Sequence, residues 1–390
     1  MTSPVRPALP VAPTPPPYGR QTLAEVLPAV AASLGAPVAA RGSGGLQLPE
    51  AARAVVLLVD GLGDVLLRSR SGHAPYLRSL LGDGLRLSSG FPSTTATSMG
   101  SFGTGLPPGA HGLVGYEVLD PARDVLLNEL SWEPYVDPHA WQPNPTVFER
   151  LDAAGVPVTR VGPAYFDGSG LTESALRGGG FVAAESFEDR VEAGLKALEA
   201  APRGLVYVYW GDIDKVGHVY GCQSWEWGEE LARVDEAVRR LAERLPGDAA
   251  LHVTADHGMV DVAMEDRLDL AHELDLAAGV RHSGGEPRAL HLYCEPGATD
   301  DVVAAWTERL GGLAWVRRRE DAVADGWFGL VSAHVLPRLG DVIVATADDI
   351  AIVDSRHQRP QLLSLIGLHG SLTEQETAVP LLTVPGSKVG

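Results

Sequence analysis

The sequence predicts an α/β fold in which a mostly parallel sheet is sandwiched by helices and carries a smaller inserted cap region. Three apolar runs indicate strands buried on both faces: AVVLLV at 54–59, LVYVYW at 205–210 and AALHVT at 249–254. Stretches with helical apolar spacing alternate with these strands: 146–155, 188–200 and 223–245. This alternation is what a parallel sheet covered on both faces requires.

The chain divides into a short tail and one large domain. We expect residues 1–20 to form a disordered tail, because the first seventeen residues hold seven prolines. Residues 21–390 then form the domain. The sequence pattern of this domain changes at about 262–366, where Gly- and Arg-rich turns interrupt short strands. Because strong motifs lie on both sides of this segment, we interpret it as a cap insertion.

Composition narrows the class of partner. The chain has 31 basic and 50 acidic residues and a formal net charge of −19, which repels nucleic-acid backbones. We expect a small substrate and no nucleic-acid polymer. The apolar runs are shorter than the roughly 20 residues that cross a bilayer, so we expect no membrane partner. Cys222 and Cys294 lack a CxxC partner and no secretory signal is recognisable, which favours a cytoplasmic location.

Each of the three strands closes on acidic and glycine residues. In open α/β sheets ligands gather outside the carboxyl ends of the strands, so these ends are expected to converge on one site. Six side chains of metal-binding type follow the strands or lie near the C-terminus: Asp60, Asp214, His218, Asp256, His257 and His369. A lone aspartate there is usually a turn former or a helix cap. The ordered set instead predicts two divalent ions with open positions; Zn²⁺ is favoured, and Mn²⁺ or Fe accepts the same ligands.

Residues 90–105, GFPSTTATSMGSFGTG, are rich in hydroxyls and carry no charge. A serine or threonine here can serve as a nucleophile when a divalent ion holds it as the alkoxide. The segment also reads as a turn that leads into a helix N-terminus, which favours a phosphoryl group. Taken alone, it is more typical of an ordinary Ser/Thr-rich helix cap, and only the accompanying motifs favour the functional interpretation.

The motifs, taken in order, resemble the alkaline phosphatase superfamily and, within it, the nucleotide pyrophosphatase/phosphodiesterase family. They are VVLLVDGLG, FPSTTATSMGSFGTGLPPGAHGLVG, DIDKVGHVYG, TADHGM and LHG. The resemblance implies an alkaline phosphatase-like catalytic domain. It places the nucleophile on Thr95 rather than Thr94 or Thr97. It also implies two zinc sites, one held by Asp214, His218 and His369 and one held beside the nucleophile by Asp60, Asp256 and His257.

The sequence departs from the family pattern at Ser98, where the family has an asparagine that contacts a phosphoryl oxygen. A serine donates one such bond over a shorter reach, so the contact either weakens or passes to the backbone N–H of Ala96. His111 is expected to pack rather than to bind metal. The assignment of the family's last histidine to His369 rests on a short HG match. Three other histidines remain candidates for that role: His291, His334 and His357.

The resemblance implies a two-metal hydrolase of phosphodiesters or nucleotide pyrophosphates that forms a covalent phosphothreonine. The expected partner is a small phosphorylated substrate such as a nucleotide. A phosphomonoesterase, a phosphonate hydrolase and a non-catalytic metal- or nucleotide-binding protein remain alternatives. A monoesterase calls for an extra cation, and three arginines of the cap could supply it: Arg288, Arg338 and Arg356. Four aromatic residues could stack a base, although core packing is the commoner role: Tyr116, Tyr165, Phe166 and Trp210.

Overall fold

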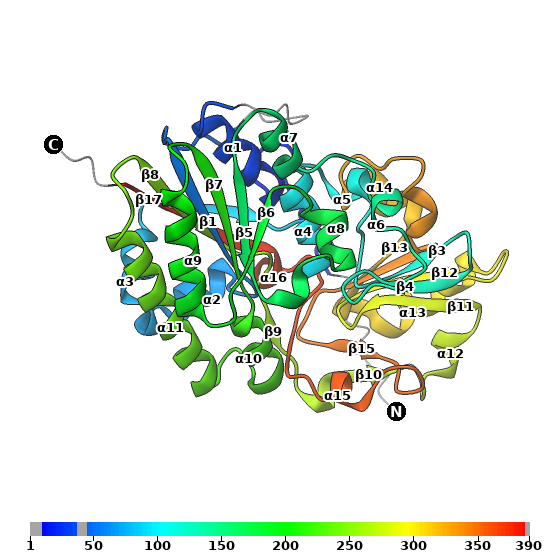
Figure 1. Cartoon of the computed structure of the whole chain (residues 1–390). Coiled ribbons are helices and arrows are strands. Elements are labelled where there is room, and N and C mark those ends of the chain that lie inside the picture. The colour runs from blue at the N-terminus through cyan, green and yellow to red at the C-terminus, as the bar shows by residue number, and fades with distance from the viewer. Residues whose placement is uncertain (1–9, 37–44, 387–390) are drawn as a thin grey trace.

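The central element is a seven-stranded sheet, seen in the computed structural model of the chain, which describes residues 10–36 and 45–386 (Figure 1). The strand order is β2-β17-β8-β1-β7-β5-β6. Neighbours from β8 to β6 are parallel, and β17 runs antiparallel to β8 and β2. The bounds are β1 Arg53–Val59, β2 Leu85–Ser88, β5 Val158–Gly162, β6 Gly180–Ala183, β7 Gly204–Trp210, β8 Ala249–Thr254 and β17 Ala378–Pro385. The predicted α/β class is confirmed.

Helices cover both faces of this sheet, and β7 shows how the faces divide. Val206 and Val208 lie under Gly194 of α9, whereas the ring of Tyr207 points to the other face. The larger helices and the short turns of helix are α1 Val26–Ser33, α2 Asp64–Ser69, α3 Pro75–Leu80, α4 Thr95–Thr104, α5 Pro108–His111, α6 Pro138–Trp141, α7 Val147–Ala153, α8 Gly170–Ala175, α9 Phe187–Glu199, α10 Asp212–Tyr220, α11 Trp225–Glu243 and α16 Glu374–Thr377. Alternation of β-strand side chains thus produces the expected sandwich.

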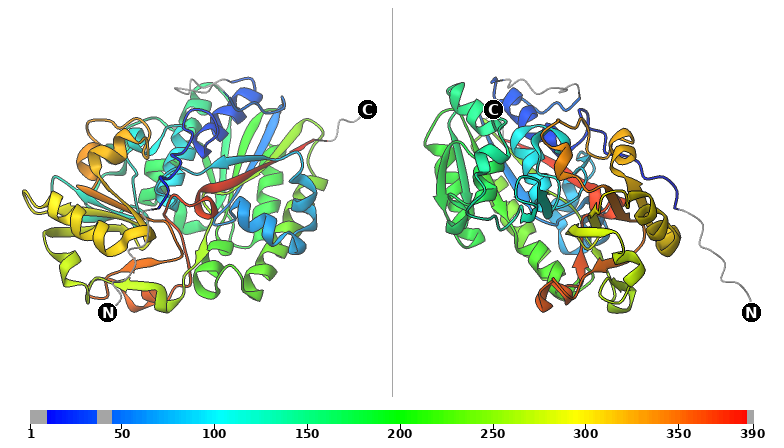
Figure 2. Two further views of the ribbon diagram at one scale, coloured as in Figure 1. Left: turned by 180° about the vertical axis from the view of Figure 1, so that it is seen from behind. Right: turned by 90° about the vertical axis from the view of Figure 1, so that its right-hand side faces the viewer.

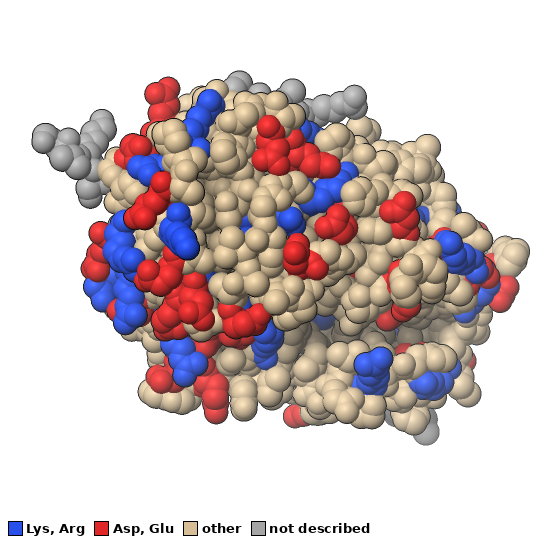
Figure 3. All heavy atoms as spheres, viewed as in Figure 1, with Lys and Arg blue, Asp and Glu red and all other residues tan. Residues whose placement is uncertain are grey.

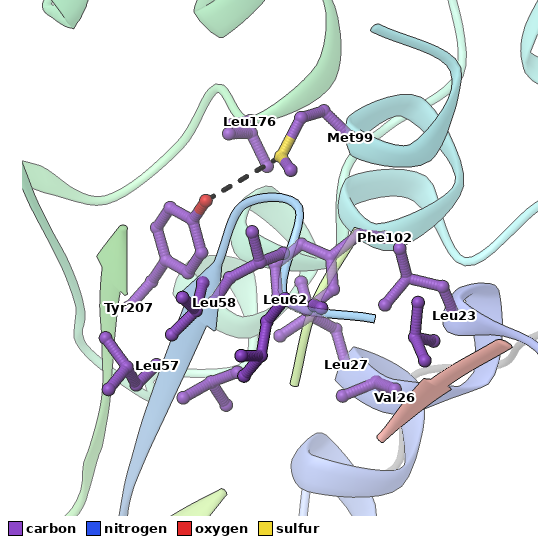
Figure 4. Packing of buried hydrophobic residues seen from close by; sticks show 14 of the residues in the cluster. Leu23, Val26, Leu27, Leu57, Leu58, Leu62, Met99, Phe102, Leu176 and Tyr207 are labelled. Atoms are coloured by element: carbon purple, nitrogen blue, oxygen red, sulfur yellow. Dashed lines mark hydrogen bonds between the residues drawn. The ribbon is translucent and has the colours of Figure 1, made fainter. Parts of the chain in front are cut away.

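Helix α4 packs on the sheet through Phe102 and Met99 (Figure 4). The Tyr207 ring lies 5.5 Å from the ring of Phe102, and its hydroxyl lies 3.7 Å from the sulfur of Met99. Phe102 is fully buried. These contacts fix the N-terminal end of α4 over the carboxyl ends of the strands.

A second, smaller sheet lies within segment 262–366, which is called the cap below, in the order β11-β12-β14-β13 (Figure 1, yellow and orange). The helices and strands of the cap are β10 Arg267–Asp269, α12 Leu274–Ala277, β11 Val280–Glu286, β12 Ala289–Cys294, α13 Thr299–Leu310, β13 Ala314–Arg318, α14 Arg319–Ala324, β14 Val342–Thr346, β15 Ala351–Val353 and α15 Pro360–Leu363. The hairpin β3 Glu117–Asp120 and β4 Val125–Asn128 lies beside it. At its base, β9 (Val260–Asp261) pairs with β16 (Gly367–Leu368), so the two ends of segment 262–366 lie side by side.

The N-terminal tail differs from the expectation of disorder. Residues 1–9 lie outside the described residues, but 10–20 follow a defined path. The Trp315 indole N–H donates to the carbonyl of Val11 at 2.7 Å. The Tyr18 hydroxyl donates to the Trp327 carbonyl at 2.8 Å and accepts from the Phe91 amide at 3.1 Å. Aromatic hydrogen-bonding groups thus hold a proline-rich segment whose backbone offers few donors of its own. Figure 2 shows the segment emerging from the domain.

None of the helices within 10–36 and 45–386 has the length and apolar character needed to cross a bilayer. On the face drawn in Figure 3, Lys and Arg side chains intermix with Asp and Glu. No continuous basic band is visible on that face.

His111 packs in the interior as a neutral side chain. The Leu113 amide donates to its Nδ1 at 3.1 Å, so its Nε2 carries the hydrogen and donates to the Ser101 hydroxyl at 3.0 Å. Burial, together with the nearby Arg338 charge, lowers the pKa of His111 to about 3. Protonation would place a second N–H against the Leu113 amide. The folded state therefore resists protonation that the unfolded chain accepts at about pH 6.5.

This difference predicts acid sensitivity. Because the pKa of His111 is lower in the folded than in the unfolded state, its contribution is complete above pH 6.5 and is lost as the pH falls toward 3. Between pH 7.5 and pH 5, the free energy of unfolding of the wild type should fall by about 2 kcal/mol more than that of His111→Gln. Urea unfolding across this range measures the difference. Parallel pH profiles would contradict the assignment.

Candidate active site

The three strand-end aspartates meet because β8, β1 and β7 are neighbours in the sheet. Asp60 follows β1, Asp256 follows β8, and Asp214 lies in the first turn of α10 after β7. The Asp60 amide donates to the Trp210 carbonyl at 2.8 Å. Asp256 Oδ1 accepts from the amides of Gly61 at 3.0 Å and His257 at 2.9 Å. Backbone donors thus fix one oxygen of Asp256 and leave the other free.

Three imidazoles face this carboxylate cluster through the same ring nitrogen. Nδ1 of His218 lies 2.7 Å from the Gly367 carbonyl, and Nδ1 of His257 lies 3.1 Å from the Gly258 carbonyl. Nδ1 of His369 lies 3.0 Å from the Ser93 carbonyl. Because a carbonyl can only accept, each Nδ1 must carry the hydrogen. Each Nε2 therefore keeps a lone pair that is directed toward the aspartates.

Two groups of side chains have the spacing of metal ligands. Ligand atoms of Asp214, His218 and His369 lie within 4.8 Å of one another, as do those of Asp60, Asp214 and His257. Asp214 is common to both groups. The resemblance assigns Asp256 to the second site instead, and its Oδ2 lies 3.4 Å from His257 Nε2. The structure thus brings all six expected ligands together.

Buried oxygens without hydrogen-bond partners test whether the residues fit metal ions. Such oxygens in the described chain include Asp60 Oδ1, Asp214 Oδ1 and Asp256 Oδ2. A buried carboxylate oxygen without a partner is costly, and a cation removes that cost. Oxygens of this kind beside imidazole lone pairs match the donor set of Zn²⁺ and related divalent ions.

The electrostatics of the cluster also favour a cation. Burial raises the pKa of Asp60 well above its usual value, and repulsion from Asp256 and Asp214 adds to the effect. Burial likewise raises the pKa of Asp256. Burial and the neighbouring imidazoles of His257 and His218 lower the pKa of His369 well below its usual value. Divalent ions would stabilise the deprotonated state of all these groups at once.

The Ser/Thr-rich segment brings one accessible hydroxyl to this cluster. Thr95 is the first residue of α4, and its Oγ1 lies 3.2 Å from His257 Nε2. Ser93, Thr94 and Thr97 are buried, whereas Thr95 is partly exposed. Among these hydroxyls, Thr95 combines access with contact to the Asp/His cluster.

Ser98 is directed elsewhere. Its side chain is fully buried, and its hydroxyl donates to the Asp256 carbonyl at 2.8 Å. The single hydroxyl hydrogen is therefore engaged in holding α4 to the loop after β8. This geometry does not favour the expected donation from Ser98 to a phosphoryl oxygen.

Residues 54–372 match the family described as type I phosphodiesterase/nucleotide pyrophosphatase. The match covers most of the chain, including all six candidate ligands and Thr95. The chain belongs to this family. Its members are metal-dependent enzymes of the alkaline phosphatase superfamily.

Curated relatives share shorter stretches. Phosphopentomutase of Anaeromyxobacter dehalogenans (strain 2CP-C) is 37% identical over 123 residues, which are 30% of this chain and 28% of that protein. Human ectonucleotide pyrophosphatase/phosphodiesterase family member 5 is 24% identical over 311 residues, which are 77% of this chain and 62% of that protein. The matches therefore cover less than two thirds of the length of these relatives.

Solved structures share the fold. An inactive murine ectonucleotide pyrophosphatase/phosphodiesterase 5 in complex with AMP aligns with a TM-score of 0.67 at 18% identity, covering 84% of this chain and 87% of that one. Phosphonoacetate hydrolase from Sinorhizobium meliloti 1021 in complex with phosphonoacetate aligns with a TM-score of 0.68 at 20% identity, covering 89% and 92%.

The rival histidines do not belong to either candidate ligand group among the described residues. His291 is buried, with Nε2 2.9 Å from the Val114 carbonyl and Nδ1 accepting from the Gly340 amide at 3.1 Å. His334 and His357 are exposed. Of the four candidates for the last histidine, the structure brings His369 to the cluster.

The three cap arginines are engaged elsewhere. Arg288 is fully buried in an ion pair with Glu376, with N to O distances of 2.7 and 2.8 Å. Arg338 donates to the carbonyls of Gly112 and Trp141, and Arg356 pairs with Asp354. The ion-pair partners of the three site aspartates in the described chain are imidazoles.

The aromatic candidates separate into core and surface residues. Trp210 is buried, stacks on Phe187 and donates its indole N–H to Glu230. Tyr165 is exposed and meets the edge of Phe166 with ring centroids 4.7 Å apart. The Phe166 ring in turn lies 5.1 Å from that of Tyr209. Tyr116 is half-buried.

Tyr209 is a site residue that the sequence reasoning missed. Its hydroxyl donates a hydrogen bond to Asp60 Oδ2, so it orients that carboxylate and leaves Oδ1 available for a metal. The available signal was its place near the end of the strand before Asp214, where side chains of one face point into the site. A tyrosine in an apolar strand is read first as a core residue.

Tyr209→Phe should weaken metal binding at the site that contains Asp60. Loss of a partner that orients a ligand typically costs about 10–100-fold in metal affinity. Zinc competition with a chromogenic chelator measures the change. Tyr207→Phe is the matched control in the same strand, because the hydrogen bond of the Tyr207 hydroxyl among the described residues is the weak one with Met99. Equal affinities for the two variants would contradict the assignment.

Proposed function

We propose that the protein is a two-metal hydrolase of phosphodiesters or nucleotide pyrophosphates that works through a covalent phosphothreonine on Thr95. The observation that carries the proposal is the position of the Thr95 hydroxyl, 3.2 Å from His257 and at the N-terminus of α4. The two candidate ligand groups supply sites for two divalent ions, for which Zn²⁺ is our first choice.

Asp214, His218 and His369 would hold one ion, and Asp60, Asp256 and His257 the other. When bound, the ions neutralise charge on the attacking and leaving oxygens. Thr95 Oγ1, after its proton passes to water, attacks phosphorus in line, and the bond from phosphorus to the leaving oxygen breaks. Water then attacks the same phosphorus from the vacated side. The bond to Oγ1 breaks and the free threonine returns.

The N-terminus of α4 offers donors for the phosphoryl oxygens. The first N–H groups of a helix have no partner within it, and the helix dipole favours negative charge there. The side chain of the N-cap residue Thr94 makes no capping hydrogen bond. Because the Ser98 hydroxyl is engaged, we assign the phosphoryl contact to the backbone N–H of Ala96.

Charge and aromatic surface support a diester over a monoester. A monoester dianion is commonly met by an additional cation, and the three cap arginines are committed to other partners. The exposed ring of Tyr165 and its neighbour Phe166 lead toward Tyr209 and Asp60. These rings suit an aromatic leaving group or a nucleobase. The AMP complex of the murine relative agrees with a nucleotide substrate.

Thr95→Ala should abolish turnover of an aryl nucleotide diester while both metals remain bound. Thr97→Ala is the matched control on the same helix turn, because the Thr97 hydroxyl is fully buried and has no hydrogen-bond partner among the described residues. Steady-state rates and metal content of the two variants provide the comparison. Full activity in Thr95→Ala would refute the nucleophile assignment.

The purified protein should contain about two zinc equivalents, lose turnover on chelation, and prefer an aryl nucleotide diester to the matching aryl phosphate. The same panel should include phosphonoacetate and a pentose phosphate, the substrate types named by the similar proteins. A preference for the monoester, the phosphonate or the pentose phosphate would replace the proposed substrate class. Absence of both metal and turnover would refute the two-metal hydrolase and leave only the fold assignment.

A further inference from the structure

We propose that Glu286, delivered by a hairpin of the cap, is a positioning residue for the metal ligand His369. This inference rests on the proposed function, because it assigns a role to the cap at the same metal site. The sequence shows no family motif between 262 and 366, so no motif identifies Glu286 as a site residue.

Glu286 ends β11, at the turn into β12. The residue is 7% exposed, and its Oε2 lies 3.4 Å from Nδ1 of His369. Its Oε1 is buried without a hydrogen-bond partner in the described chain. Burial of a carboxylate oxygen without a hydrogen-bond partner costs free energy, so this arrangement needs a specific explanation.

The His369 ring supplies that reason. Its Nδ1–H donates to the Ser93 carbonyl at 3.0 Å, which sets the tautomer and the ring plane. The negative charge of Glu286 beside the same nitrogen makes the opposite nitrogen, Nε2, a stronger ligand. Nε2 faces Asp214 Oδ1 at 3.9 Å. A carboxylate, an imidazole and a metal site therefore lie in sequence.

The chain is shaped to admit this carboxylate. Gly370 follows His369 with φ +130°, and a Cβ added there would lie 2.7 Å from Cγ of Glu286. No side chain fits that gap unless the hairpin moves away. The glycine thus permits the close approach of two segments that are 84 residues apart in sequence.

A second contact fixes the hairpin at this distance. Arg288 lies just beyond Glu286 and pairs through two hydrogen bonds with Glu376, and both side chains are fully buried. Glu376 Oε1 also accepts from the Ser371 amide at 3.0 Å. The hairpin is therefore clamped to the segment that follows His369, which holds Glu286 in place.

Glu286 also adjoins the nucleophile segment. Burial raises the pKa of Glu286 well above its usual value, and a hydrogen bond from the Thr94 side chain opposes this shift. Ser93 pairs with Gly370 through its amide, which donates to the Gly370 carbonyl at 2.9 Å. The cap carboxylate thus touches the two segments that carry His369 and Thr95.

The test is zinc binding by the full chain, measured by competition with a chromogenic chelator. Glu286→Gln and Glu286→Ala should each weaken one of the two sites by about 10–100-fold and leave the other unchanged. Gly370→Ala should weaken the same site, because it displaces the hairpin. Glu273→Gln, which removes a cap carboxylate paired with Arg309, is the matched control and should bind zinc as the wild type does.

A double-mutant cycle identifies the site. His369→Ala should abolish the site that Glu286→Ala weakens, and the double variant should show no further loss. Wild-type affinity at both sites in Glu286→Ala and Glu286→Gln would overturn the inference. So would an equal loss at both sites with a lowered melting temperature of the zinc-free protein, because that pattern reports general destabilisation.

The zinc readout separates this inference from the proposed function. If the wild type binds two zinc ions but hydrolyses none of the phosphoryl substrates, the proposed function fails while the Glu286 result stands. If the wild type turns over substrate and Glu286→Gln binds zinc normally, the inference fails alone.

Discussion

Three aspartate carboxylates share one buried site, and their mutual repulsion is the constraint around which the rest of the structure is arranged. Each carboxylate has one oxygen that is buried without a hydrogen-bond partner among the described residues. The surroundings counter this cost in part. Backbone amides hold Asp256, and the Tyr209 hydroxyl holds Asp60. The remaining unsatisfied charge is what divalent ions would neutralise.

The same constraint explains why the site is assembled from so many segments. The adjacency of β8, β1 and β7 supplies the aspartates, and the segment before β17 supplies His369. Contacts of Met99 and Phe102 with Tyr207 hold α4 against the sheet, so that Thr95 lies at the start of a packed helix. Rigid support of this kind keeps a nucleophile within reach of its site.

The cap places a carboxylate beside the Asp/His cluster and does not place an arginine there. Its arginines serve the fold, as the buried pair of Arg288 and Glu376 shows. We infer that its residue Glu286, whose carboxylate lies 3.4 Å from His369 Nδ1, positions that imidazole. Under the proposed function, bound ions would supply the positive charge of this site, which would suit a substrate with one negative charge on the reacting phosphoryl group.

The sequence alone determined the α/β class, the alternating strands and helices and the family, and it predicted the six candidate ligands, because buried strands and ordered motifs leave local patterns. It also singled out the hydroxyl segment. Only the tertiary structure separated Thr95 from the other hydroxyls by access, engaged Ser98 with the Asp256 carbonyl, and brought His369 rather than His291 to the cluster. It alone revealed Tyr209 and Glu286 and the path of residues 10–20. These features depend on contacts between segments far apart in the chain, and no local pattern of residues encodes such contacts.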